Sequence, residues 1–131
     1  MDDITVKNIE QIEAYSGPHA IPGIRFRPAR AALGVSSWGM SVLELDPNCT
    51  GYPEHDHADD GHEEVYLVLR GPIYLVTPDG ERELQQGDFV RVEPTARRKF
   101  VTHDRPAAIL ALGGTPGQPY APSMGRPVAR P

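Results

Sequence analysis

The sequence contains very little cysteine and lysine, and it has no long uninterrupted apolar run. The single cysteine, Cys49, excludes an internal disulfide framework. The N-terminus "MDDITVKNIE" is acidic and lacks the apolar stretch of a signal peptide or membrane span, so we expect a cytoplasmic protein. Lys and Arg total 13 against 18 for Asp and Glu, a net charge of -5, which argues against nucleic acid or an anionic membrane as a partner.

Long helical patterns are also lacking, whereas 14 prolines and 13 glycines punctuate the 131 residues. A chain of this length is expected to form one domain with one core. Apolar and polar residues alternate in short runs that are separated by turn residues, which predicts an all-β sandwich or barrel, including the double-sheet jelly roll. The expected strands lie within residues 37–45, 64–69, 72–77, 81–92, 97–102 and 107–112.

The two ends of the chain differ from this strand pattern. In "NIEQIEAY", Asn8 is followed three residues later by Gln11, the spacing of a capping box, which predicts a short helix over residues 8–15. Residues 114–131 carry too much Pro and Gly for a regular element, so we expect a tail or a clasp there.

The stretch "YPEHDHADDGHEEVYLVLRG" holds the most informative polar residues of the chain. His55 and His57 are two residues apart, so an extended backbone projects both imidazoles from the same face. Glu64 begins the next apolar run, and a hairpin-like return would complete a set of two histidines and one carboxylate, which suits a divalent metal. The alternative is a solvated His-x-His pair on a surface loop.

These residues resemble the first motif of the cupin superfamily, in which a Gly, a His-x-His pair, a Glu and a closing Gly occur in that order. Here they are Gly51, His55, His57, Glu64 and Gly71, with a gap after His57 about two residues longer than usual. "GDFVRVEPTARRKFVT" resembles the second motif, although Arg98 stands where that motif carries a metal-binding His.

The resemblance implies one cupin domain over residues 1–131, a double-sheet jelly-roll β-barrel whose core spans about residues 33–113. It further implies a homodimer and a site at the barrel mouth, with His55, His57 and Glu64 as metal ligands. Arg98, His62 and Tyr66 are the candidate ligand-binding residues. For Tyr66 the alternative is packing in the barrel wall.

Arg98 leaves two chemical interpretations open. A guanidinium that points into the barrel places a permanent positive charge where a metal would lie, and it pairs with Glu64 or with a ligand carboxylate. An Arg98 side chain that turns outward leaves a three-ligand ion with open positions, and His62 could supply a further nitrogen.

Two classes of function follow from these interpretations. In the first, the protein is an enzyme that uses Zn, Mn, Fe or Ni for oxygenase, isomerase or lyase chemistry. In the second, it is a metal-free protein that binds a small polar or carboxylate-bearing molecule, with Arg98 replacing the charge of the metal. A DNA-binding regulator is not expected, because the chain shows no helix-turn-helix pattern.

Overall fold

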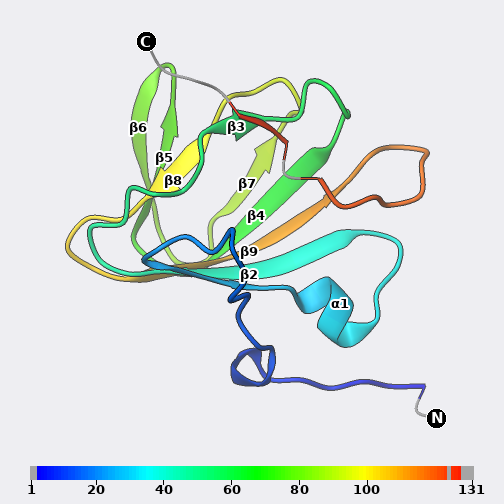
Figure 1. The fold of residues 1–131 in the computed structure, drawn as a ribbon. Helices are drawn as coiled ribbons and strands as arrows, with labels where there is room; N and C mark the ends of the chain where they lie inside the picture. Colours follow the sequence, from blue (N-terminus) through cyan, green and yellow to red (C-terminus); the bar gives the residue numbers. More distant parts are fainter. Residues whose placement is uncertain (1–2, 124, 128–131) are drawn as a thin grey trace.

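The computed structural model describes residues 3–123 and 125–127, and these residues are nearly all in strands and turns (Figure 1). The largest sheet has five antiparallel strands in the order β1-β2-β9-β4-β7, and a second has three in the order β6-β5-β8. A two-stranded pair, β10-β3, completes the set. The strands are β1 (Ile24–Arg27), β2 (Gly39–Leu45), β3 (His55–Asp56), β4 (Glu63–Arg70), β5 (Ile73–Thr77), β6 (Gly80–Leu84), β7 (Phe89–Val92), β8 (Lys99–Val101), β9 (Ala107–Gly114) and β10 (Arg126–Pro127).

The predicted all-β jelly roll is confirmed, with one difference in how the sheets meet. The larger sheets face each other as in a jelly roll, but the described strands do not pair around a closed barrel. The sheet also extends beyond the expected core, because β1 pairs with β2 from Ile24↔Leu45 to Arg27↔Val42. The sequence analysis anticipated neither β1 nor the short helix α1 (Ala29–Leu33).

The core lies between the two larger sheets. Leu43, Tyr66 and Ile109 reach it from the five-stranded sheet, while Ile73 and Phe100 reach it from the three-stranded sheet. Side chains alternate between the two faces of a strand, and the buried core residues follow this alternation: Leu43 and Leu45 on β2, Tyr66 and Val68 on β4, and Ala107, Ile109 and Ala111 on β9. Full burial of each large apolar side chain contributes about 1.5 to 3 kcal/mol, and the neighbouring polar residues are held on this frame.

The N-terminal segment packs against the sheet through the buried Ile12, a backbone hydrogen bond from Tyr15 to Phe26, and the side chain of Arg27. The predicted capping box is present: the Asn8 side chain accepts a hydrogen bond from the backbone at the start of the helix, and the Gln11 side chain accepts one from the backbone N–H of Asn8. The helix itself is a 3-10 helix, η1 (Ile9–Gln11), and is shorter than expected. Arg27 on β1 donates to the carbonyl oxygens of Ile9 and Ile12, at 3.3 and 2.9 Å, and to Glu44 at 2.6 Å. One guanidinium thus joins η1 to the sheet.

The described part of the C-terminal segment contains a short strand, although its composition predicted no regular element. β10 pairs with β3 in the register Arg126↔Asp56 and Pro127↔His55. The chain therefore returns to the histidine stretch after leaving the sheet at β9. Within the described residues, no helix is long and apolar enough to cross a membrane.

We expect Arg27→Leu to lower the free energy of unfolding by about 1 to 3 kcal/mol, because it removes the buried donor to the Ile12 carbonyl and the shorter of the two arginine contacts to Glu44. Arg25→Leu is the matched control, since Arg25 shares Glu44 from the same strand but its side chain is 46% exposed. An exposed pair of this kind contributes about 0 to 1 kcal/mol. Urea unfolding measures both, and equal losses would contradict the anchoring role of Arg27.

Candidate metal centre

Four of the predicted site residues come together at one end of the molecule. His55 lies on β3, His57 follows it, and Glu64 is the second residue of β4. Arg98 pairs with His55 through two backbone hydrogen bonds of 3.1 Å, so the two residues are direct cross-strand neighbours. Segments far apart in sequence thus deliver two imidazoles, one carboxylate and one guanidinium to the same place.

The Glu64 carboxylate is the centre of this cluster. Its Oε1 lies 3.4 Å from Nε2 of His57 and 3.8 Å from Nε2 of His55. One ligand atom from each of His55, His57 and Glu64 lies within 4.8 Å of the others. The geometry therefore brings together the two-histidine, one-carboxylate set that the sequence indicated.

The other ring nitrogens of the two histidines are engaged by acceptors. Nδ1 of His55 lies 3.0 Å from the carbonyl oxygen of Pro53, and Nδ1 of His57 lies 3.1 Å from Oδ1 of Asp60. Both acceptors require a proton on Nδ1, so in the neutral ring Nε2 carries a lone pair. Two lone pairs then face a carboxylate, and a proton or a metal cation between these three groups would stabilise the arrangement.

Arg98 points into the site, and the alternative of an outward-facing side chain is wrong. Its side chain is 1% exposed, and it donates to Oε1 of Glu64 and, at 2.9 Å, to the carbonyl oxygen of Ala96. Its Nε is buried and has no hydrogen-bond partner among the described residues. The guanidinium thus balances the charge of Glu64 and retains one unused donor.

Tyr66 adds a hydroxyl group to the same carboxylate. It is buried in the core and donates to Oε1 of Glu64 at 2.6 Å, while the Tyr52 hydroxyl lies 3.5 Å from that of Tyr66. Burial raises the pKa of both phenols, that of Tyr52 to about 12, so both hydroxyls keep their protons. The predicted residue therefore packs in the wall and also contacts the site.

His62 and Asp60 form a second group behind His57. The rings of His57 and His62 stack with centroids 5.0 Å apart, and Nδ1 of His62 lies 3.4 Å from the Thr115 hydroxyl. His62 groups with His57 and Asp60, and not with His55 and Glu64. The sequence analysis missed Asp60. Its position three residues after His57, within a turn, could have indicated a hydrogen bond between the two side chains.

The site's electrostatics favour an ionised Glu64. Burial acts to raise the pKa of Glu64, but the nearby imidazoles of His55 and His57, the hydrogen bond from Tyr66 and the charge of Arg98 outweigh it and hold that pKa well below 4.5. Burial acts to lower the pKa of His57, but Glu64 and Asp60 outweigh it and raise that pKa above 6.5. A metal-free site thus favours a protonated His57 beside a carboxylate anion.

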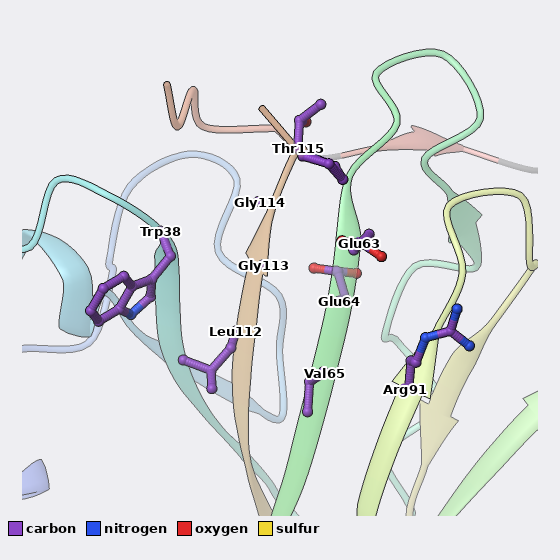
Figure 2. Close-up of a pocket in the computed structure, with 10 residues that line it drawn as sticks. Trp38, Glu63, Glu64, Val65, Arg91, Leu112, Gly113, Gly114 and Thr115 are labelled. Carbon is purple, nitrogen blue, oxygen red and sulfur yellow. The ribbon is translucent and has the colours of Figure 1, made fainter. Parts of the chain in front are cut away.

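A hollow of about 340 Å³ lies on the outer face of the five-stranded sheet. Figure 2 shows Trp38 and Arg91 on opposite sides of it, with Leu112 and Val65 between them. The histidines do not line this hollow, and Trp38 is 46% exposed. Glu64 is among the residues that line the hollow, so this outer surface adjoins the metal-ligand set at that residue.

We expect Glu64→Gln to lower the free energy of unfolding by about 3 to 5 kcal/mol, because it leaves the buried Arg98 charge unpaired. The double variant Glu64→Gln with Arg98→Met should recover most of that loss. Because the folded-state pKa of Glu64 is lower than its ordinary 4.5, its stabilising effect is present above that pH and is lost as the pH falls below it.

Urea unfolding in the presence of a chelator, repeated from pH 7 to 3, measures both effects. The double variant should lose less stability toward acid than the wild type does. A single variant as stable as the wild type would show that the pair carries no buried charge.

Comparison with known proteins gave matches among solved structures, whereas no family model and no curated protein sequence matched. The polyketide cyclase RemF from Streptomyces resistomycificus superposes with a TM-score of 0.76 at 21% identity, over 98% of this chain and 87% of its own. A sugar phosphate isomerase of the cupin superfamily from Silicibacter pomeroyi gives 0.70 at 22% identity, over 83% and 74%. A Cupin 2 conserved barrel domain protein from Salinispora arenicola gives 0.65 at 15% identity, over 86% and 89%. The described part of this chain therefore has the cupin fold.

Proposed function

We propose that this protein is a metal-dependent enzyme that acts on a small polar or carboxylate-bearing molecule. In this proposal Nε2 of His55, Nε2 of His57 and the carboxylate of Glu64 hold one divalent cation, such as Zn, Mn, Fe or Ni. Two imidazoles and one carboxylate leave open coordination positions, as catalytic metal sites require.

One observation carries the proposal, which is the convergence of three electron-pair donors whose histidines are already oriented. Hydrogen bonds to Pro53 and Asp60 keep the protons of both rings on Nδ1, on the side away from Glu64. Histidines that bind metals in proteins commonly donate their second nitrogen to a carbonyl or carboxylate in this way. The chemistry of the donor set therefore fits a divalent cation.

We further propose chemistry without net oxidation, of the isomerase or lyase kind. A bound divalent cation would supply Lewis-acid polarisation of a ligand oxygen. Two neighbours in fold are named as an isomerase and a cyclase, and an isomerisation involves no net oxidation. The oxygenase alternative predicts activity with iron alone, whereas Lewis-acid chemistry also works with zinc, which has no redox chemistry.

The surrounding residues would act on the bound ligand in distinct ways. Tyr66 and Arg98 both donate to Oε1 of Glu64 and so fix the orientation of that carboxylate. The unused Nε of Arg98 is a donor suited to a ligand carboxylate. The buried rings of Tyr52 and Phe100 pack edge to face at 5.5 Å, and the Tyr52 ring lies 5.9 Å from that of His55, so they form an apolar wall beside the cluster.

A second candidate function is supported by the contact between Arg98 and Glu64. A guanidinium already neutralises the carboxylate and would repel a dication beside it. In that case the protein binds a small anion without metal, and a protonated His57 supplies further positive charge. Metal titration separates the two candidates.

We expect the wild type to bind one Zn²⁺ or Mn²⁺ per chain, and His57→Ala to weaken binding by at least about tenfold, because one ligand is lost. Arg98→His should strengthen binding by more than about tenfold, or about 1.4 kcal/mol, since it removes repulsion and adds a nitrogen donor beside His55. Arg98→Gln, which removes only the charge, should give a smaller gain.

Calorimetric titration of tag-free protein measures these affinities. A wild type that binds neither ion, beside an Arg98→His variant that binds both, would support the metal-free candidate. An Arg98→His variant with the affinity of the wild type would contradict the proximity of residue 98 to the ion.

We also propose that the protein forms a homodimer through the outer face of its five-stranded sheet. Val65 and Leu112 form an apolar centre there, and Glu63 and Arg91 line the same hollow (Figure 2). A two-fold axis through the apolar centre would set Glu63 of one copy against Arg91 of the other, which makes the surface self-complementary. Phe89, which neighbours Leu67 on the same sheet, is 73% exposed and would gain burial in the dimer.

We expect Leu112→Glu to convert the dimer to a monomer at micromolar concentration, because it buries a charge in the interface, while Leu112→Met leaves the dimer intact. Glu63→Arg should also weaken the dimer, and Glu63→Arg with Arg91→Glu should restore it. Light scattering gives the mass of each variant. A monomeric wild type would refute the proposed dimer.

A further inference from the structure

The C-terminal strap, residues 115–123 and 125–127, crosses the end of the molecule where the histidines lie. In Figure 1 the orange-to-red chain leaves β9, turns, and comes back over the top to pair with β3. That pairing sets Pro127 opposite His55. The strap therefore covers the same residues that form the candidate metal centre.

Tyr120 makes the first of three contacts that hold the strap. Its ring lies 5.5 Å from the His62 ring, and the Arg30 guanidinium lies 4.7 Å from its centroid in a cation–π contact. A Cβ atom at Gly39 would come within 2.6 Å of the Tyr120 hydroxyl oxygen, so the ring fills the space that glycine leaves. The strap is thus seated on α1, β2 and the histidine group at once.

Ser123 makes the second contact, through Asp60. Its hydroxyl donates to Oδ2 of Asp60, the same carboxylate that accepts from Nδ1 of His57. Thr115, at the start of the strap, donates to the backbone oxygen of Asp60 at 3.1 Å. One carboxylate therefore joins the strap to a candidate metal ligand.

Gly125 makes the third contact with its backbone. A Cβ atom there would lie 2.7 Å from Cδ2 of His55 and 3.0 Å from Cε1 of His57, and its φ of +74° also favours glycine. The strap therefore rests directly on both imidazoles, which leaves them 9% and 2% exposed. A ligand cannot approach these rings from the strap's side while the strap is seated.

We propose that the C-terminal strap is a gate that must lift from His55 and His57 before a ligand or ion exchanges at the candidate metal centre. The inference rests on the proposed function for its role, because it describes access to the same site. Among the strap's described residues, the contacts include the Tyr120 ring against His62 and Arg30, hydrogen bonds from Thr115 and Ser123 to Asp60, and a two-residue strand pairing. Such contacts open locally at small energetic cost while the core remains folded.

Asp60 contacts both the strap and the site. When Ser123 departs, Asp60 loses a donor but keeps His57 Nδ1 and the backbone N–H of His62, which lies 3.0 Å from Oδ1. Asp60 is thus a positioning residue that holds His57 in both positions of the strap.

The test uses a double variant that carries both Tyr120→Ala and Ser123→Ala. Its control is the single variant Tyr120→Phe, and both are compared with the wild type. The double variant loses the ring and the hydroxyl, whereas Tyr120→Phe keeps the ring and no described hydrogen bond uses its hydroxyl. Release of Zn²⁺ from the loaded protein into excess EDTA should be about tenfold faster in the double variant, given the usual strength of one cation–π contact and one charged hydrogen bond. Tyr120→Phe should release the ion at the wild-type rate.

A second measurement uses metal-free protein, so that the gate and the metal centre fail separately. Diethyl pyrocarbonate should modify His55 and His57 about tenfold faster in the double variant than in the wild type, for the same two lost contacts. His103, whose side chain is 51% exposed, is the internal control and should react at one rate throughout. Peptide mass spectrometry follows each histidine.

Equal modification rates of His55 and His57 in all three proteins would overturn the gate whether or not metal binds. Faster modification in the double variant, with no zinc bound to any protein, would support the gate and refute the metal centre. Faster modification together with unchanged zinc release would overturn the gate for metal exchange.

Discussion

The buried carboxylate of Glu64 is the constraint around which this end of the molecule is organised. A carboxylate taken out of water is costly unless its charge is compensated, and four side chains compensate this one. Arg98 and Tyr66 donate to it directly, while His55 and His57 present their Nε2 atoms at 3.8 and 3.4 Å. Each of these groups has a polar atom close to Glu64, although the core and the C-terminal strap also bury them.

The fold supplies that carboxylate with partners from separate strands. β4 carries Glu64 and Tyr66 two residues apart, so both side chains point to the inner face. β3 carries His55 and leads directly into His57. It pairs with Arg98 and also with β10, so the arginine, the two histidines and the C-terminal strap are all positioned by one short strand. A change in any of these elements therefore reaches the same cluster.

Arg98 distinguishes this site from an ordinary set of three metal ligands. Its positive charge balances the carboxylate of Glu64, so the site can be stable without a metal ion. The same charge repels a metal cation placed beside it. His57 is held between Glu64 and Asp60. A proton on Nε2 of that ring would offset the negative charge of Glu64 in the metal-free state, as a metal cation would in the loaded state. Protons and metal ions would thus compete for the same lone pair.

The sequence by itself determined the strand-rich class and the chemically important residues. Alternation, turn residues and motif spacing indicated the jelly roll, the pairing of His55 with His57 and the role of Glu64 as their partner, because these signals are local in the chain. Only the tertiary structure decided the direction of Arg98, the place of His62 behind His57, the addition of β1 to the sheet and the return of the strap to β3. These features depend on contacts between segments distant in sequence, which no local pattern encodes.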